Sequence, residues 1–359
     1  MEQWDSEKVF FSSRDFYGHL LREIPLAEKS IDVEAYIFEL DELGNRIVEE
    51  LRRAAARGVA VRVLLDGIGC LHTAEELVAR FSGTAVRVRI YHPVFWHSVF
   101  AFTRKLNRRN HRKTWLIDSR TAYVGSMNIV QNRWTDHGIR IQGRYTALLN
   151  QAFVKCWLGN ARWRHLARPS VFRRRVPYQK GKWLRLNDTL LKRRRNYRLL
   201  LQQSRNATGR IWLASAYFVP RLGLVRALCK AARRGVDVRI MVPKTSDVFF
   251  MPWIASTYYL VLLNAGVKIY EYLPAFFHAK VQVIDDWASI GSTNLNYRSL
   301  LHDLEVDVVV TMPENRSLLE AELMRGFDSS KVVTAETIKE IPWFQSVASR
   351  LFLLFKRWM

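Results

Sequence analysis

Two short segments of the chain share one pattern of histidine, lysine and aspartate. HRKTWLID (111–118) and HAKVQVID (278–285) each place a Lys two positions and an Asp seven positions after a His. In an extended strand, side chains two positions apart point to the same face, and side chains an odd number apart point to opposite faces. Each His is therefore expected beside its Lys, while each Asp is expected in a structural or supporting role. These residues are His111, Lys113 and Asp118 in the first copy, and His278, Lys280 and Asp285 in the second.

A neutral imidazole beside an ammonium group suits attack on a phosphodiester. The imidazole can be the nucleophile at phosphorus, and the Lys charge stabilises the negative charge that develops on the oxygens. Repulsion from the ammonium also lowers the pKa of the imidazole and helps to keep it unprotonated. One His cannot easily both attack and protonate the leaving oxygen. Two copies brought together would divide these tasks between a nucleophile and a general acid–base.

A second repeated pattern follows each copy. VGSMNI (124–129) and IGSTNL (290–295) share Gly-Ser-x-Asn, in which the glycine permits close backbone approach and the polar side chains are candidates to bind phosphate oxygens. Farther along, Asp136 and Glu305 are candidates to orient and polarise an imidazole through its second ring nitrogen. The four candidate substrate-binding residues are Ser126, Asn128, Ser292 and Asn294.

Each motif alone also has a simpler interpretation. A single His-x-Lys is common by chance in a basic chain, and both octapeptides could be half-buried strands. Two copies, each followed at a similar distance by Gly-Ser-x-Asn, favour the functional interpretation. A metal site or other cofactor is not expected, because a Lys beside each His would repel a cation and no His-x-x-x-His or Cys cluster accompanies them.

The segments around the motifs repeat as well. LRRAAARGVAVRVLLD (51–66) is echoed by LCKAARRGVDVRIMVP (228–243), and each pattern predicts the end of a helix, a Gly stop and a strand. Upstream, IDVEAYIFE (31–39) and IWLASAYFVP (211–220) share Ala-Tyr followed by two apolar residues and are predicted to be buried strands. This order indicates duplication of a whole α/β domain.

The chain is divided accordingly into four parts. We expect a first domain at residues 1–160, a basic connector at 161–205, a second domain at 206–342 and an amphipathic aromatic-basic tail at 343–359. Within the connector, residues 162–198 have one acidic residue. Aromatic residues interleave with its Arg and Lys, so it is either a solvated linker or a surface that faces lipid headgroups.

The amino-acid composition indicates what kind of partner the chain binds. The 359 residues carry 56 Lys and Arg against 33 Asp and Glu, a formal net charge of +23. This excess implies an anionic partner, either nucleic acid or an acidic lipid surface. The three cysteines have no paired spacing and are expected to be reduced thiols in a cytosolic protein. We expect neither a secretory signal nor a membrane-spanning helix, because no basic-apolar leader and no run of about 20 apolar residues is present.

The duplicated motif resembles the signature of the phospholipase D superfamily over nearly the whole chain. The second block, HAKVQVIDDWASIGSTNLNYRSLLHDLEV (278–306), is similar to bacterial phospholipase D-type cardiolipin synthases and carries their GSxNLxxRSLxxxxE pattern. The resemblance implies two mixed β-sheets flanked by helices, with the active site at a pseudo-twofold interface. It also implies metal-free ping-pong transfer, with His111 as nucleophile, His278 as general acid and then base, and both lysines on the phosphoryl oxygens. The motif aspartates belong to the catalytic signature by this resemblance.

Some features depart from that pattern. A Gly-Ser stands where many synthases have a first Gly-Gly, and the spanning helices of longer members are missing. NRWTDHG (132–138) is shorter than expected before Asp136. The motif chemistry is unaffected, but the acceptor specificity stays open.

The resemblance implies a phosphatidyltransferase that makes cardiolipin from phosphatidylglycerol and releases glycerol. The alternatives are a phospholipid hydrolase, a phosphodiesterase or nuclease of the same superfamily, and a non-catalytic membrane-binding protein. The expected partners are anionic phospholipid and the membrane surface, not nucleic acid, and oligomerisation is not required. The expected location is the cytoplasmic face of the bacterial cytoplasmic membrane, reached through the tail or through the aromatic-basic segment 94–110.

Overall fold

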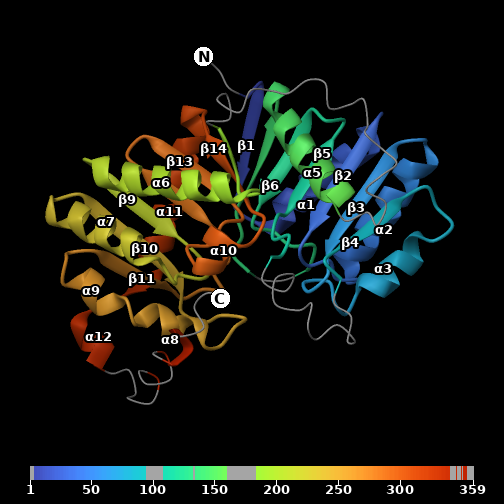
Figure 1. The fold of residues 1–359 in the computed structure, drawn as a ribbon. Coiled ribbons are helices and arrows are strands. Elements are labelled where there is room, and N and C mark those ends of the chain that lie inside the picture. Colours follow the sequence, from blue (N-terminus) through green and yellow to red (C-terminus); the bar gives the residue numbers. More distant parts are fainter. Residues whose placement is uncertain are drawn as a thin grey trace.

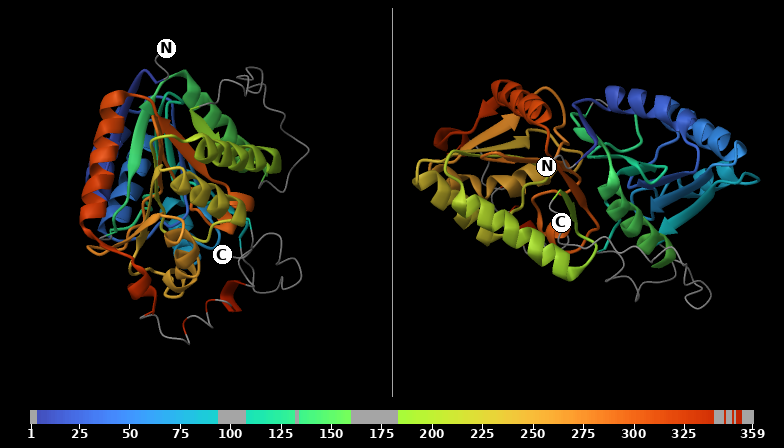
Figure 2. Two further views of the ribbon diagram at one scale, coloured as in Figure 1. Left: turned by 90° about the vertical axis from the view of Figure 1, so that its left-hand side faces the viewer. Right: turned by 90° about the horizontal axis from the view of Figure 1, so that it is seen from above.

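The computed structural model describes residues 4–93, 108–131, 134–159 and 183–339, with residues 345, 349 and 351–353 of the tail. The described chain forms two domains that lie side by side, each built on one β-sheet flanked by helices (Figures 1 and 2). This arrangement confirms the predicted α/β class and the duplication.

The first domain contains a seven-stranded mixed sheet in the order β1-β7-β6-β5-β2-β3-β4. Strands β2, β3 and β4 are parallel, and the other pairs are antiparallel. The strands are β1 (Ser6–Phe10), β2 (Ser30–Ala35), β3 (Ala60–Asp66), β4 (Arg87–Tyr91), β5 (Thr114–Ile117), β6 (Thr121–Gly125) and β7 (Gly138–Gln142). The helices are α1 (Ser13–Glu23), α2 (Glu42–Ala56), α3 (Ala74–Phe81) and α5 (Ala147–Gly159), with 3₁₀ turns η1 (Ile24–Leu26) and η2 (Arg144–Thr146).

The second domain contains an eight-stranded mixed sheet in the order β15-β11-β10-β9-β12-β13-β14-β8. Its strands are β8 (Leu184–Leu186), β9 (Arg210–Ala214), β10 (Asp237–Pro243), β11 (Lys268–Tyr272), β12 (Val281–Ile284), β13 (Trp287–Gly291), β14 (Val306–Val310) and β15 (Ser330–Val332). Its helices are α6 (Leu190–Asn206), α7 (Leu222–Arg233), α8 (Met251–Ser256), α9 (Tyr259–Leu263), α10 (Tyr297–Leu301), α11 (Pro313–Asp328) and α12 (Ala335–Lys339).

The two sheets repeat one topology, which corrects the predicted connector. Strands β2 to β7 correspond in order to β9 to β14, and β8 stands beside β14 as β1 stands beside β7. Residues 184–205, expected in the connector, therefore contain β8 and all of α6 except its last residue, and both belong to the second domain. The dense positive charge of α6 made this segment look like a solvated linker. Most of its Arg side chains are exposed, whereas Arg193, Leu200 and Ser204 are buried.

The predicted helix–Gly–strand units form as expected. Helix α2 begins at Asp41, whose side chain accepts a hydrogen bond from the Gly44 amide at 2.9 Å. The chain leaves α2 and α7 through Gly58 and Gly235, which have φ angles of 92° and 90°. A residue with a Cβ is strained in this left-handed conformation, which explains the glycine at both stops.

One apolar core joins the two domains. It is formed by the facing sides of the two central sheets and includes Leu116, Val124 and Ile139 from the first domain, and Val281 and Ile290 from the second. Burial of this shared surface fixes the domains against each other, which matters because the candidate site lies across their boundary.

The segments proposed to contact membranes are only partly described. Residues 94–107 and most of the tail lie outside the described residues. In the tail, Ser349 donates a hydrogen bond to the Trp253 carbonyl at 3.0 Å, and Phe352 stacks on Phe250 with ring centroids 4.9 Å apart. These described tail residues therefore dock on α8. Across the described part of the chain, no helix is both long enough and apolar enough to cross a bilayer.

Candidate active site

Reciprocal backbone contacts bring the two histidine motifs to the domain boundary. The His111 amide donates to the Leu304 carbonyl at 3.0 Å, and the Leu304 amide donates to the Arg109 carbonyl at 2.9 Å. The other domain repeats this arrangement, with the His278 amide bonded to the Thr135 carbonyl at 2.9 Å. Each histidine is thereby held next to the residue that precedes the predicted carboxylate of the opposite domain.

The carboxylates cross the boundary to bind the histidines. His111 Nδ1 lies 3.0 Å from Glu305 Oε1, and His278 Nδ1 lies 2.7 Å from Asp136 Oδ1. Each imidazole is thus oriented by the other half of the repeat, which leaves its Nε2 free to face substrate. The sequence pointed to both carboxylates but did not tell which histidine each would meet.

Without bound substrate, the surroundings of both histidines favour the neutral imidazole. Burial, followed by the charge of Lys113, lowers the pKa of His111 well below its usual value. Burial, followed by the charge of Lys280, lowers the pKa of His278 to about 4. A neutral imidazole is the form that can attack phosphorus or accept a proton.

The two carboxylates have different environments. Burial opposes ionisation of Asp136, but its interaction with His278, including the hydrogen bond from that ring, outweighs burial and lowers the pKa of Asp136 to about 2. Burial raises the pKa of Glu305 to about 7. The His278 side of the site therefore has a permanent negative charge, whereas the His111 side has one that titrates near neutrality.

Each motif lysine lies beside its histidine, as strand alternation predicts. Lys113 Nζ donates to the His111 carbonyl at 2.9 Å, and Lys280 Nζ donates to the His278 carbonyl. Burial lowers the pKa of Lys113 to about 8, so it keeps its charge at neutral pH. Arg112 points to the opposite face, where it pairs with Glu34 at 2.7 Å.

The Gly-Ser-x-Asn residues separate into two groups. Ser126 Oγ donates to Asp136 at 2.5 Å, and Ser292 Oγ donates to Glu305 at 2.5 Å. The serines were predicted to bind phosphate, but in the structure they hold the two carboxylates. Asn128 and Asn294 both line the cavity, and their buried Oδ1 atoms have no hydrogen-bond partner among the described residues. The asparagines therefore remain the candidates for substrate binding.

The motif aspartates lie away from the histidines, at hairpin turns. Asp118 accepts hydrogen bonds from the amides of residues 28–30 at 2.7 to 3.1 Å, and Asp285 does the same for residues 208–210 at 2.8 to 3.0 Å. Partial burial opposes ionisation, but these backbone bonds lower the pKa of both carboxylates. Their grouping with the catalytic residues is corrected, because they connect strands and touch neither histidine.

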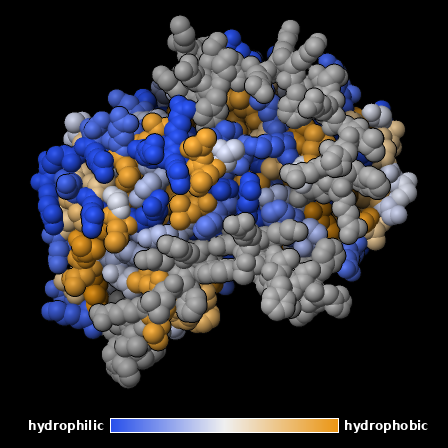
Figure 3. Space-filling model, viewed as in Figure 1, coloured by the Kyte–Doolittle hydropathy of each residue, from blue (hydrophilic) through white to orange (hydrophobic). Residues whose placement is uncertain are grey.

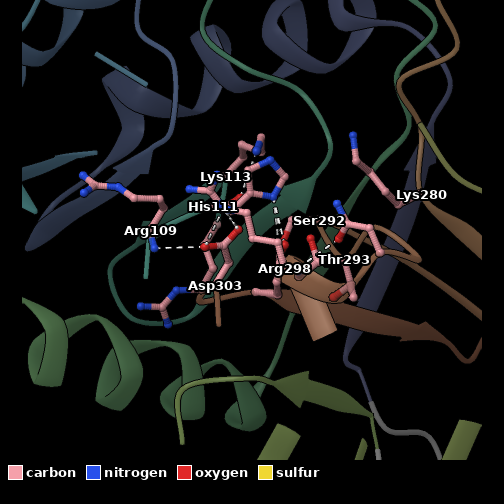
Figure 4. A network of polar contacts seen from close by, with 12 residues as sticks. Arg109, His111, Lys113, Lys280, Ser292, Thr293, Arg298 and Asp303 are labelled. Atoms are coloured by element: carbon pink, nitrogen blue, oxygen red, sulfur yellow. Dashed lines mark hydrogen bonds and ion pairs between the residues drawn. The ribbon is translucent and has the colours of Figure 1, made fainter. Parts of the chain in front are cut away.

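Further polar residues support the His111 segment and were not singled out from the sequence. Asp303 accepts a hydrogen bond from the Arg109 amide at 2.9 Å and pairs with Arg298 at 3.1 Å (Figure 4). The Arg109 side chain pairs with Asp66 at 3.1 Å, and both side chains are fully buried. Arg298 belongs to the GSxNLxxRSL pattern of the second block, which was the available signal, but the first half has no matching residue to reveal its role.

Histidines and asparagines from both domains line one cavity of about 360 Å³. Its walls also include Tyr36, Trp134 and Tyr217. The Tyr36 ring lies 4.7 Å from the His111 ring, and the Trp134 ring lies 5.0 Å from the His278 ring. Aromatic walls beside polar groups suit a substrate that joins a phosphate to an apolar part. The described residues contain no cluster of His, Cys, Asp or Glu that could hold a metal ion.

Residues 20–157 and 200–326 match the family described as "Cardiolipin synthase, PLD-like domain". The chain belongs to this family. The probable cardiolipin synthase YwiE of Bacillus subtilis (strain 168) is 30% identical over 337 residues, which cover 90% of this chain and 66% of that protein. Cardiolipin synthase A of Pectobacterium atrosepticum is 31% identical, over 94% of this chain and 72% of that protein. The predicted membership of this phospholipase D-type family of phosphatidyltransferases is confirmed, and the chain spans about two thirds of the YwiE length.

Solved structures agree on the fold. Phosphatidylserine synthase from Haemophilus influenzae Rd KW20 has a TM-score of 0.73 and 14% identity, covering 100% of this chain and 96% of that one. Polyphosphate kinase from Porphyromonas gingivalis has a TM-score of 0.63 and 13% identity, covering 98% of this chain and 53% of that one. At these identities the similarity concerns the fold alone. It extends over both domains of this chain.

Proposed function

We propose that the chain transfers the phosphatidyl group of one phosphatidylglycerol molecule to the hydroxyl of a second, forming cardiolipin and releasing glycerol. The observation that carries this proposal is the pair of crossed His–carboxylate contacts around one cavity. Two oriented imidazoles can attack phosphorus and move a proton without any other reactive group, and the named relatives of similar sequence are cardiolipin synthases.

In the first half-reaction, His111 Nε2 attacks phosphorus and the bond from phosphorus to the glycerol oxygen breaks. His278 gives its Nε2 proton to that oxygen, so glycerol leaves neutral and a phosphatidyl-histidine remains. The charge of Asp136 at 2.7 Å stabilises His278 in its protonated form, which supports the acid–base role for this residue. The bound phosphodiester anion adds to this effect and opposes the lowering of the His278 pKa by burial.

In the second half-reaction, the acceptor hydroxyl gives its proton to His278 and attacks phosphorus. The bond from phosphorus to His111 breaks, and cardiolipin leaves. Glu305 stabilises His111 whenever the ring carries positive charge, because its carboxylate lies 3.0 Å from Nδ1. Lys113 and Lys280 offset the charge on the phosphoryl oxygens, and Asn128 and Asn294 fix the phosphate through their side-chain amides.

The proposed partner is an anionic phospholipid membrane, bound peripherally on its cytoplasmic face. The net charge of +23 favours anionic lipid. On the face seen in Figure 3, apolar patches interrupt a hydrophilic surface. Phe249 has 67% of its surface exposed and follows Val248, which lines the cavity, so an apolar contact with acyl chains adjoins the site. Because one chain supplies both histidines, oligomerisation is not required, and nucleic acid is not the expected partner.

The same chemistry would serve a hydrolase if water replaced the acceptor alcohol. The test is mass spectrometry of the lipids formed from phosphatidylglycerol vesicles without added metal, with His111→Ala and His278→Ala as controls. We expect cardiolipin and equimolar glycerol from the wild type alone. Phosphatidic acid as the sole product would indicate a hydrolase, and no lipid product together with cleavage of oligonucleotides would indicate a nuclease.

A further inference from the structure

The repeat is broken at one position on the cavity wall. Four residues beyond the ends of β3 and β10 stand Cys70 and Asp247. Cys70 is buried, and its Sγ contacts the Tyr36 carbonyl at 3.2 Å, so it offers nothing to the cavity. Asp247 is exposed and lines the cavity. The two ends of the pseudo-symmetric site therefore differ in chemistry.

Asp247 is held by a tyrosine that is itself a repeat residue. The Tyr217 hydroxyl donates to both Asp247 oxygens, at 2.7 and 2.8 Å, and Ser246 Oγ donates to one of them at 3.0 Å. No Lys, Arg or His among the described residues pairs with this carboxylate. Asp303, the other carboxylate on the cavity wall, is paired with Arg298. A carboxylate offers about four acceptor positions, so Asp247 retains capacity for a ligand.

The Asp247–Tyr217 pair lies on the His278 side of the cavity. The Tyr217 ring is 6.5 Å from the Phe276 ring, which is 5.5 Å from the His278 ring. Tyr36, the counterpart of Tyr217 in the first domain, lies instead against His111 at 4.7 Å. A group bound by Asp247 therefore shares the cavity with His278, the histidine that exchanges protons with alcohols, and lies on its side.

We propose that Asp247 and Tyr217 form a subsite for a second hydroxyl group of the alcohol that leaves or attacks at phosphorus. This inference rests on the proposed function and extends it to a preference for polyol headgroups. One hydroxyl of the glycerol group exchanges its proton with His278 Nε2, while the neighbouring hydroxyl donates a hydrogen bond to Asp247. Tyr217 fixes the orientation of the carboxylate.

A hydroxyl suits this position better than a cation or an anion. The charge of Lys113 lies in the same site and repels an ammonium headgroup, and the Asp247 charge repels a second phosphate. Water and alcohols with a single hydroxyl group cannot make both contacts. A ligand that lacks the second hydroxyl forgoes a hydrogen bond to a charged acceptor, which is among the stronger hydrogen bonds in proteins.

The test separates the acceptor step from the donor step. Vesicles containing phosphatidyl-p-nitrophenol are incubated with the protein and an equimolar mixture of glycerol and ethanol. Release of p-nitrophenol reports the donor step, and mass spectrometry gives the ratio of phosphatidylglycerol to phosphatidylethanol. The variants are Asp247→Ala, Asp247→Asn and Tyr217→Phe. Asp286→Asn is the matched control, because Asp286 is an exposed carboxylate in the hairpin turn between β12 and β13.

We expect Asp247→Ala to lower the phosphatidylglycerol to phosphatidylethanol ratio by about tenfold or more, with p-nitrophenol release within about threefold of wild type. Asp247→Asn keeps an acceptor oxygen and should lower the ratio less, Tyr217→Phe should give an intermediate loss, and Asp286→Asn should leave it unchanged. An unchanged ratio in Asp247→Ala would overturn the inference, and so would an equal loss of both products, which indicates a structural role.

A second arm replaces glycerol by ethanolamine. If wild type prefers ethanolamine to ethanol and Asp247→Asn removes that preference while glycerol transfer persists, the subsite binds an ammonium group and the inference is wrong. The proposed function has its own readout. Failure of the wild type to make cardiolipin from phosphatidylglycerol would refute that function, whereas the glycerol-to-ethanol ratio of the variants would still decide the role of Asp247.

Discussion

The crossed carboxylates allow a sharp prediction, because one of them titrates near neutrality and the other does not. Glu305→Gln and Asp136→Asn each replace a carboxylate by an amide of the same shape. The amide introduced by Glu305→Gln can still accept a hydrogen bond from His111, but it cannot stabilise positive charge on the ring. The two variants therefore remove equivalent charges from the two sides of one site.

The size of the effect follows from the geometry. At 3.0 Å, and with an effective dielectric constant of about 20, the attraction between imidazolium and carboxylate is on the order of 5 kcal/mol. An amide dipole retains part of this stabilisation. We therefore expect each variant to lower kcat by about 10² to 10⁴, with a much smaller effect on KM.

The pH profiles should distinguish the variants. Because the pKa of Glu305 is about 7, its protonated fraction grows as the pH falls below neutrality, and wild-type activity should decline there. Glu305→Gln should lose this acidic limb, since an amide does not titrate. Asp136→Asn should keep it, because Asp136, with a pKa of about 2, is ionised throughout the range.

The assay measures cardiolipin formation on phosphatidylglycerol vesicles from pH 5 to pH 9, with circular dichroism and thermal melting to confirm folding. A Glu305→Gln protein with activity within threefold of wild type would refute the proposed charge stabilisation. An acidic limb that persists in Glu305→Gln would show that another group titrates there.

Three further predictions concern residues outside the reacting pair. Asp118→Ala leaves three backbone amides without an acceptor, so thermal melting should show that the free energy of unfolding falls by about 1–3 kcal/mol, while turnover at 25 °C persists. Loss of turnover in the folded variant would contradict the structural role of Asp118. Burial lowers the pKa of His137 to about 4, below its value in the unfolded chain. The neutral ring therefore contributes its full stability above about pH 6.5, and the free energy of unfolding falls by on the order of 3 kcal/mol as the pH drops toward 4. His137→Phe should therefore raise the urea midpoint at pH 5 relative to that at pH 7, and an unchanged difference between the two would refute this. Phe249→Asp should weaken sedimentation with anionic vesicles, whereas Leu318→Asp, at another exposed apolar residue, on α11, should not; equal effects would argue against a specific contact through Phe249.

The repeat carried most of what could be predicted from the sequence. Strand alternation placed Lys113 beside His111 and Arg112 on the opposite face, and both placements are observed. The helix–Gly–strand units correctly predicted β3 and β10, which lie in the parallel half of each sheet. These features depend on neighbours in the chain, and a local pattern is sufficient to specify them.

The contacts between the domains could not be predicted in the same way. The sequence did not indicate which imidazole Asp136 would orient. Asp136 lies 25 residues after His111, yet its partner is His278, 142 residues away. That choice depends on how the two sheets pack through their shared core, which no spacing within one repeat encodes. Ser126 was misplaced for a different reason. Its hydrogen bond to Asp136 lies within the first domain and depends on the register in which the end of β6 meets β7.

The crossing makes the two halves chemically interdependent. Each domain supplies one histidine and the carboxylate that orients the other, so neither domain alone contains a complete imidazole–carboxylate pair. Because symmetry would give both ends of the cavity the same ligand preference, any division of labour between His111 and His278 must come from departures from the repeat. Among the described residues, such departures include the different titration of Glu305 and Asp136, the pairing of Asp303 with the unmatched Arg298, and Asp247 opposite Cys70. The roles of the two histidines should therefore follow these asymmetries, with His278 as the proton carrier on the alcohol side.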